Sequence, residues 1–280
     1  MSLPSIDSLR TDLQTLQPAS GTGESIVRET REALATARVP GLGGPTDPPG
    51  GPASDLAGYI DHTELHPEAT TAEVTAVIDD AREYGFASVC IAPTHVPRAA
   101  AALDGTAVDV CTVVGFPHGA NRSTTKAHEA HTAVIDGARE VDLVLNVGAI
   151  RDGQFGAAEA DVRAVVEAAQ DAADKVDASR DGLEVKVILE TALLTDAQKA
   201  VACTVAKRAG ATFVKTSTGF ADGGATAEDV ALMRQIVGDA CGVKASGGVG
   251  SASDARRMIA HGATRIGASG SVGIVTGTSA

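Results

Sequence analysis

The pattern of hydrophobic and polar positions changes near Ala57. From there to the C-terminus, short apolar runs alternate with longer stretches in which apolar residues recur at helical spacing. A short apolar run followed by a helical stretch is typical of a β/α unit. We expect eight strands, near residues 58 to 61, 86 to 92, 108 to 114, 140 to 147, 184 to 190, 212 to 216, 241 to 245 and 264 to 267.

Several of the helical stretches begin with a capping signature, a Ser or Thr followed three residues later by an acidic residue or Gln. These signatures are Thr70 to Glu73, Thr195 to Gln198, Thr226 to Asp229 and Ser251 to Asp254. Eight β/α units favour a closed barrel, because a doubly wound sheet usually has fewer strands and often a glycine-rich turn after its first strand. We therefore predict an α/β fold, a (β/α)8 TIM barrel over residues 57–280.

Residues 1–56 differ from the rest of the chain. Helical spacing of apolar residues over 23 to 37 predicts one amphipathic helix. Residues 40 to 54 hold five of the eleven prolines, which predicts a linker. We expect an N-terminal helical extension that packs on the barrel or on a partner subunit.

Composition narrows the range of partners. The net charge of −13 argues against nucleic acid or an anionic membrane as the main partner, because both require a basic surface. The chain begins without the basic and apolar segments of a secretory signal, and no apolar run approaches ~18 residues. The four cysteines lie far apart in or beside apolar segments, which is typical of buried reduced thiols. These features predict a soluble cytoplasmic protein.

Two lysines lie at the ends of predicted strands and are followed by small residues. Lys215 begins the sequence Lys-Thr-Ser-Thr-Gly, and Lys244 begins Lys-Ala-Ser-Gly-Gly. An ammonium group inside a buried strand is costly unless it is paired, deprotonated or chemically engaged. Two such lysines on consecutive strands would lower each other's proton affinity, and a desolvated lysine beside a second cation can act as an amine nucleophile. The same pattern also fits a buried network of structural ion pairs.

Alternation along the strands suggests which charged groups join these lysines. If the polar faces of the fourth and fifth strands point inward, Asp142 and Lys186 lie inside the barrel with Lys215 and Lys244. We expect two or more cations for each carboxylate in this cluster. Asp61, placed at the end of the first strand, either contributes from the barrel mouth or belongs to a turn.

Glycines lie at the ends of the last three predicted strands. They are Gly219, the pair Gly247 and Gly248, and Gly267, which precedes Ser269. Glycine lets backbone N–H groups approach an anion closely, and the loops after strands seven and eight are the usual phosphate position in this barrel. The sequence therefore predicts a phosphate site at these residues, with simple turns as the alternative.

Histidines offer a rival interpretation, a catalytic metal. His62 and His66 lie four residues apart, and His128 and His131 form a second close pair. Neither has the His-Glu-x-x-His pattern, and Pro67 disfavours a helix that would bring the first pair together. We predict no metal site.

Together these segments resemble the deoxyribose-phosphate aldolases, class I aldolases with a (β/α)8 barrel, from about residue 57 to 275. The resemblance is carried by Asp61-His62-Thr63, Gly115-Phe116-Pro117, Glu140-Val141-Asp142, Lys186-Val187-Ile188 with Glu190, Lys215-Thr216-Ser217-Thr218-Gly219 and Lys244-Ala245-Ser246-Gly247-Gly248.

The resemblance implies that Lys215 forms a Schiff base, that Lys244 lowers the proton affinity of Lys215, and that Asp142 serves in a proton relay. It implies supporting roles for Lys186, Asp61 and Thr216. The implied reaction is the reversible cleavage of the sugar phosphate 2-deoxy-D-ribose 5-phosphate to D-glyceraldehyde 3-phosphate and acetaldehyde, in deoxyribonucleoside catabolism. No metal or organic cofactor is implied, because the iminium is the electron sink. A homodimer is common in the family.

The sequence departs from the family pattern at the phosphate loops and the ends. Phe220 and Gly250 stand where many relatives have a basic residue, so we expect phosphate to rest largely on backbone N–H groups. The C-terminal segment lacks the tyrosine of some relatives. Two other hypotheses are a sugar-phosphate sensor without turnover and another phosphate-handling barrel, such as a metal-dependent aldolase or an isomerase.

Overall fold

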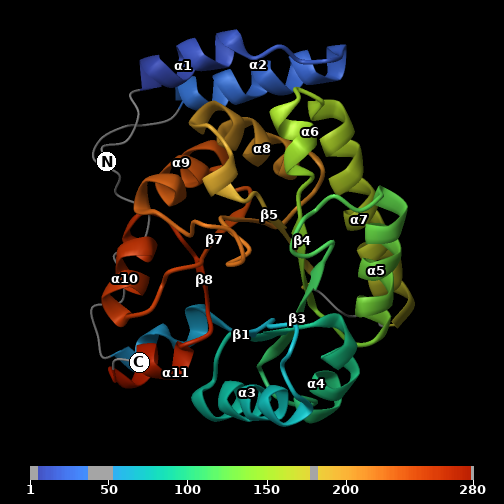
Figure 1. The fold of residues 1–280 in the computed structure, drawn as a ribbon, viewed down its shortest axis with the longest axis vertical. Coiled ribbons are helices and arrows are strands. Elements are labelled where there is room, and N and C mark those ends of the chain that lie inside the picture. Colours follow the sequence, from blue (N-terminus) through green and yellow to red (C-terminus); the bar gives the residue numbers. More distant parts are fainter. Residues whose placement is uncertain (1–5, 37–52, 177–181, 279–280) are drawn as a thin grey trace.

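The computed structural model describes residues 6–36, 53–176 and 182–278. Eight parallel strands follow one another around a closed barrel, and the last pairs with the first. The predicted TIM barrel is confirmed (Figure 1). The strands are β1 (Ile60–Glu64), β2 (Ser88–Ile91), β3 (Asp109–Val114), β4 (Glu140–Val144), β5 (Glu184–Ile188), β6 (Phe213–Lys215), β7 (Gly242–Ser246) and β8 (Arg265–Ala268).

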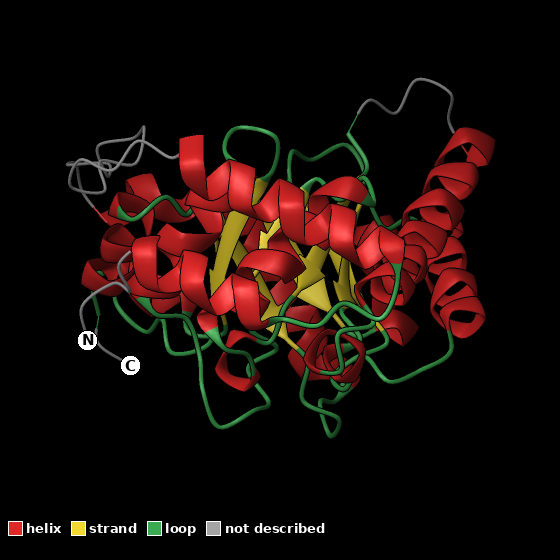
Figure 2. Cartoon of the chain, turned by 90° about the horizontal axis from the view of Figure 1, so that it is seen from above, coloured by secondary structure: helices red, strands yellow, loops and turns green. Residues whose placement is uncertain are grey.

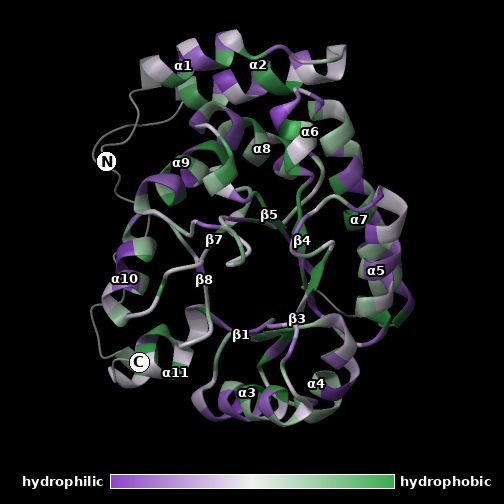
Figure 3. Cartoon of the chain, in the orientation of Figure 1, coloured by the Kyte–Doolittle hydropathy of each residue, from purple (hydrophilic) through white to green (hydrophobic). Residues whose placement is uncertain are grey.

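Helices surround the barrel and enclose its strands (Figure 2). They are α3 (Thr71–Tyr84), α4 (Val96–Ala102), α5 (Ser123–Ile135), α6 (Val147–Arg151), α7 (Phe155–Val176), α8 (Asp196–Arg208), α9 (Ala227–Val237), α10 (Ala252–Ala260) and α11 (Ser271–Thr276). The barrel region also contains three short 3-10 helices, η1 (Ala53–Tyr59), η2 (Pro93–His95) and η3 (Thr191–Leu193). Hydrophobic and hydrophilic residues alternate along the ring helices (Figure 3), as expected when one face packs on the strands.

The predicted helix starts are observed. Thr70 and Thr195 each form a complete capping box, in which the residue three positions later bonds back to the backbone. The side chains of Thr226 and Ser251 accept a hydrogen bond from the backbone N–H three residues later. These caps satisfy N–H groups that the helix leaves unpaired, so each helix begins where its signature predicts.

The N-terminal region folds as two helices, α1 (Ile6–Thr15) and α2 (Gly21–Thr36), which lie against the outside of the barrel beside α8 (Figure 1). Helix α2 lies close to the predicted range of 23 to 37, whereas α1 was not predicted. Thr30 of α2 donates a buried hydrogen bond to Thr204 of α8 at 2.8 Å. The extension therefore packs on the barrel of its own chain. Most of the predicted linker, 40 to 52, lies outside the described residues.

Strand alternation builds layers of side chains inside the barrel. Asp61, Cys111, Lys186 and Lys244 come from the odd-numbered strands, and Lys186 Nζ lies 3.6 Å from Cys111 Sγ and 3.8 Å from Asp61 Oδ2. Asp142 comes from an even-numbered strand and contacts this layer through Lys186 and Lys244. Alternate strands contribute to alternate layers, as is typical of this barrel. Among the described residues, no helix has the length and apolar character that membrane crossing requires.

Candidate active site

Asp142 is the centre of a buried charged cluster. Its Oδ2 accepts hydrogen bonds from Lys215 Nζ at 2.7 Å and from Lys244 Nζ at 2.8 Å. Its Oδ1 accepts from Lys186 Nζ at 3.1 Å. All four side chains are buried. The structure thus brings together the four residues that strand alternation suggested.

Asp61 also belongs to the cluster, and both predictions for its position were wrong. It is the second residue of β1 and is fully buried, with Oδ1 accepting from Arg265 Nη1 at 2.7 Å and Oδ2 paired with Lys244. The physical reason is that the preceding residues form η1, so β1 starts at Ile60 and runs on to Glu64. Asp61 therefore lies inside the barrel, below the mouth.

The cluster contains more carboxylates than we expected. Glu140 accepts from Lys186 Nζ at 2.6 Å and from Arg265 Nη1 at 2.8 Å, and Glu184 accepts from Arg265 Nη2 at 3.3 Å. The predicted excess of cations is therefore wrong. The sequence held a signal for Glu140, which lies two residues before Asp142 on the same strand face. Arg265 likewise lies two residues before Gly267, at the start of β8.

Charge pairing decides the protonation of the groups at the centre. Burial raises the pKa of Asp142, but the three ammonium groups that it binds outweigh burial and hold this pKa well below the usual range. Burial disfavours the charged form of Lys244, yet Asp142 and Asp61 outweigh this effect and raise the Lys244 pKa. Burial also disfavours the charged form of Lys186, but Asp142 and the other acidic groups around it outweigh this effect and raise the Lys186 pKa well above the usual value. Lys244 therefore stays a cation beside Lys215.

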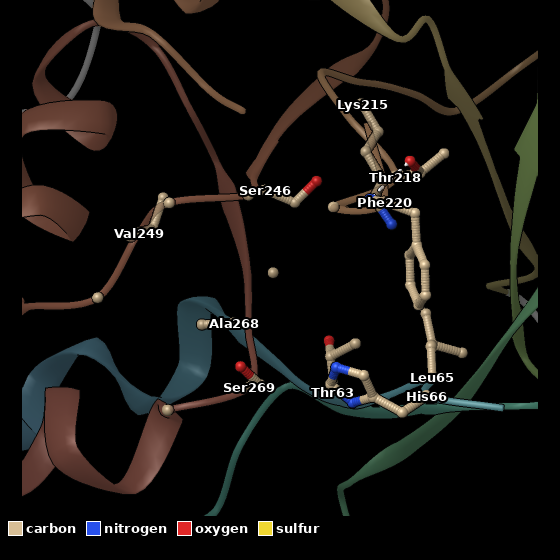
Figure 4. A pocket seen from close by; sticks show the side chains of 16 residues that line it. Thr63, Leu65, His66, Lys215, Thr218, Phe220, Ser246, Val249, Ala268 and Ser269 are labelled. Atoms are coloured by element: carbon tan, nitrogen blue, oxygen red, sulfur yellow. Dashed lines mark hydrogen bonds between the residues drawn. The ribbon is translucent and has the colours of Figure 1, made fainter. Parts of the chain in front are cut away.

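A cavity of about 450 Å³ opens at the carboxyl ends of the strands, and Figure 4 shows the side chains on its wall. Lys215 lines the cavity, whereas Lys186, Lys244 and Asp142 are not among the described residues on its wall. Carboxyl ends of the strands are where this barrel holds its active sites. Lys215 is thus the amine of the cluster that a bound molecule can reach.

The predicted phosphate residues all lie on the wall of the same cavity. Gly219, Gly247 and Gly248 have φ values of 88°, 81° and 78°, which residues other than glycine rarely adopt. Gly267 and Ser269 line the cavity from β8 and the loop after it. A Cβ at Gly267 would lie 3.0 Å from Lys244 Cε, so this glycine also makes room for the lysine.

Thr216 does not line the cavity. Its Oγ1 donates to the carbonyl of Ser246 at 3.1 Å and accepts from the Ser246 N–H at 3.1 Å. Both bonds join the loop after β6 to the end of β7. Thr216 thus holds together the two strands that carry Lys215 and Lys244.

The histidines of the rival metal interpretation point in different directions. His62 is buried against the ring of Phe86 and lies 3.7 Å from Asp80, whereas His66 lines the cavity and contacts Glu64 at 2.9 Å. Within the described residues, the two groups with metal-ligand spacing are Cys90, Cys111 and Asp142, and Asp61, Cys111 and Glu140. The carboxylates of both groups already bind lysine or arginine. These residues fit ion pairing better than a metal ion.

Comparison with known proteins agrees with this geometry. The family model described as DeoC/LacD family aldolase matches residues 56–279. The chain belongs to this family. It is 54% identical over 222 residues to deoxyribose-phosphate aldolase 2 of Bacillus licheniformis, a match that covers 79% of this chain and 95% of the relative.

Solved structures of the family share the fold. A protein from Coccidioides immitis superposes with a TM-score of 0.82 at 36% identity, covering 91% of this chain and 97% of the other. The tetrameric deoxyribose phosphate aldolase of Aeropyrum pernix gives a TM-score of 0.72 at 29% identity, covering 92% of this chain and 97% of the other. The high coverage shows that the barrel is that of the aldolase family.

The two departures at the predicted phosphate loops, Phe220 and Gly250, lie on the cavity wall. Lys215 is the one lysine or arginine among the described lining residues. An anion in this cavity would therefore meet mainly backbone N–H groups and hydroxyl groups. The C-terminal segment, which lacks tyrosine, is described up to residue 278.

Proposed function

We propose that this chain is a class I aldolase that reversibly cleaves 2-deoxy-D-ribose 5-phosphate to D-glyceraldehyde 3-phosphate and acetaldehyde. The observation that carries the proposal is the shared contact of Lys215 and Lys244 with one oxygen of Asp142, at the floor of a glycine-rich cavity. The names of the relatives agree with this substrate.

In the proposed reaction, the free amine of Lys215 attacks the C1 aldehyde of the open-chain sugar. Loss of water gives an iminium, which withdraws electrons from the neighbouring carbons. The C3 hydroxyl loses its proton, the C2–C3 bond breaks, and D-glyceraldehyde 3-phosphate leaves. The resulting enamine takes up a proton at C2, and hydrolysis releases acetaldehyde and the free lysine.

The neighbours of Lys215 support this chemistry in two ways. Lys244 is a cation held between Asp142 and Asp61, and we propose that its charge tunes Lys215 as a nucleophile. Asp142 lies below the cavity wall, so we propose that it exchanges protons with the substrate through a water molecule. Lys186 and Asp61 hold Asp142 and Lys244 in place.

We propose that the phosphate lies against the backbone at Gly219, Gly247, Gly248, Gly267 and Ser269. Positive φ at three of these glycines turns the backbone sharply and allows close approach of an anion. We further propose that residues 57–280 carry the activity, with residues 1–56 as an added unit. The role in deoxyribonucleoside catabolism, the cytoplasmic location and a homodimer stay predictions.

The test is reduction with borohydride in the presence of 2-deoxyribose 5-phosphate, followed by intact-mass and peptide mass spectrometry. The proposal requires an adduct on the peptide that carries Lys215, and its loss in Lys215→Ala. Lys175→Ala is a matched control, because Lys175 is an exposed lysine of α7. A folded wild-type protein that gives no adduct would exclude the Schiff-base mechanism. Inhibition by a chelator would point to a metal-dependent aldolase.

A further inference from the structure

Glu190 has an unusual backbone conformation directly after β5. Its φ is 55° and its ψ is 63°, and it is the one non-glycine residue with positive φ among those that the structure describes. Such a conformation costs a glutamate about 1–2 kcal/mol. It persists only where the surroundings hold it, and such residues cluster at functional sites.

The hydrogen bonds on either side of Glu190 explain the conformation. Leu189 N–H donates to the carbonyl of Lys215 at 2.9 Å, and Thr191 N–H donates to the carbonyl of Thr216 at 3.0 Å. In a regular parallel ladder, donors two residues apart reach acceptors two residues apart. Here they reach consecutive carbonyls, so the register shifts by one residue at Glu190, just beyond the last pair of the β5–β6 ladder. An extra residue of this kind redirects a side chain, as a bulge does next to many active sites.

The redirected carboxylate contacts the loop that follows Lys215. Glu190 Oε2 accepts a hydrogen bond from Thr218 Oγ1 at 2.5 Å, and both carboxylate oxygens lie within reach of Thr218 N–H, at 3.3 and 3.4 Å. Thr218 Oγ1 in turn accepts from Phe220 N–H at 3.1 Å. Glu190 is 4% exposed, so these bonds form away from bulk water, where a carboxylate must be satisfied.

This contact determines what Thr218 offers to a ligand. Thr218 lines the main cavity together with Lys215 and Gly219. A threonine hydroxyl has one proton, and that of Thr218 is committed to Glu190. The hydroxyl can therefore only accept a further hydrogen bond from the cavity side. An accepting hydroxyl suits a sugar hydroxyl group and does not suit a phosphate oxygen, which has no proton to donate when ionised.

We propose that Glu190 is a positioning residue for the aldolase reaction. It holds the loop Thr218–Phe220 against the cavity and makes Thr218 an acceptor for a hydroxyl group of the open-chain sugar. Glu190 does not line the main cavity, so it acts through Thr218. The inference rests on the proposed function, because it names a contact of the same substrate.

The test compares Glu190→Asn, Glu190→Gln and Thr218→Val with wild type. Asparagine adopts positive φ more readily than glutamate, but its side chain is one carbon shorter and fails to reach Thr218. Glutamine keeps the length and one accepting oxygen. We expect Glu190→Asn and Thr218→Val each to raise KM for 2-deoxyribose 5-phosphate about tenfold, and Glu190→Gln to restore most of the loss.

A double variant separates positioning from general stability. Because Glu190 acts through Thr218, the combined Glu190→Asn and Thr218→Val variant is expected to have the KM of the worse single variant. Borohydride trapping with acetaldehyde, which has only two carbons, is expected to label Lys215 equally in all these proteins. Additive effects on KM, or an unchanged KM in Glu190→Asn, would overturn the inference. Failure of wild type to trap acetaldehyde would instead refute the proposed function.

Discussion

Lys215 and Lys244 donate to the same oxygen of Asp142, at 2.7 and 2.8 Å. The two lysines are Cα partners in the pairing of β6 with β7, so neighbouring strands hold both at one level of the barrel. Only Lys215 of the two lies on the cavity wall among the described residues. Lys215 thus lies at the cavity, whereas Lys244 is a cation buried away from the cavity wall.

The first prediction concerns this buried charge. Lys244→Met keeps most of the length of the side chain but removes the cation, and with it the proposed tuning of Lys215. We expect kcat at pH 7 to fall about a hundredfold, and the rising limb of the pH–rate profile to move to higher pH. Steady-state assays from pH 6 to 10 would measure both. A reduced kcat with an unchanged pH profile would show that Lys244 acts only on packing. Lys175→Met is the control for the loss of a lysine elsewhere in the protein.

The second prediction concerns the missing cation at the phosphate loops. Gly250 lines the cavity, and a Cβ there would meet nothing within 4 Å, so Gly250→Arg is the variant that adds a guanidinium beside the proposed phosphate loops. We expect KM for 2-deoxyribose 5-phosphate to fall about fivefold at low salt and less at high salt. Gly250→Gln has similar bulk and no charge, and is expected to leave KM unchanged. An equal gain with unphosphorylated 2-deoxyribose would contradict a phosphate contact.

Strand alternation was enough to predict the centre of the site. Asp142, Lys186 and Lys244 are the middle residues of their strands and Lys215 ends β6, so a closed barrel of parallel strands brings all four together. The prediction that Lys244 ends its strand was wrong, because β7 continues to Ser246. The glycines line the same cavity because they lie at or just beyond the carboxyl ends of three adjacent strands. These relationships depend on local pattern and chain order, which a sequence shows directly.

Other parts of the site depend on contacts that local pattern does not show. Arg265 pairs with Glu140, which is 125 residues away in the chain, and with Asp61, which is 204 residues away. The position of Asp61 also depends on where η1 ends and β1 begins. Helix α1, which was not predicted, is ten residues long, contacts α2 and α8 and buries Leu9 and Leu13. The conformation of Glu190 likewise depends on bonds made by the neighbouring strand.

The third prediction concerns a buried ion pair outside the barrel interior. Lys126 of α5 is fully buried and donates to Asp161 at 2.8 Å and to the Val144 carbonyl at 3.0 Å. Asp161→Ala leaves the ammonium group without its charge partner, and we expect the free energy of unfolding to fall by about 3–5 kcal/mol. Combining it with Lys126→Met should recover much of this loss. The exposed pair of Arg82 and Asp79 provides the control, since Asp79→Ala should cost less than about 1 kcal/mol. Equal losses in both pairs would contradict the argument from burial.

The last prediction concerns how the free energy of unfolding depends on pH. The group involved is Glu184, at the amino end of β5. Burial, and then the neighbouring carboxylate of Glu140, raise the pKa of Glu184 from 4.5 to about 7. Because the folded protein holds this proton more tightly than the unfolded chain, the stability that it contributes is lost as the pH rises from 4.5 through 7. Glu184→Gln keeps the shape without the titration. We expect the variant to gain about 2 kcal/mol over wild type between pH 4.5 and pH 8, measured by urea unfolding. Glu167 is exposed, so Glu167→Gln should show no such gain. If the free energies of unfolding of Glu184→Gln and wild type change in parallel with pH, Arg265 already neutralises the Glu184 carboxylate at the higher pH.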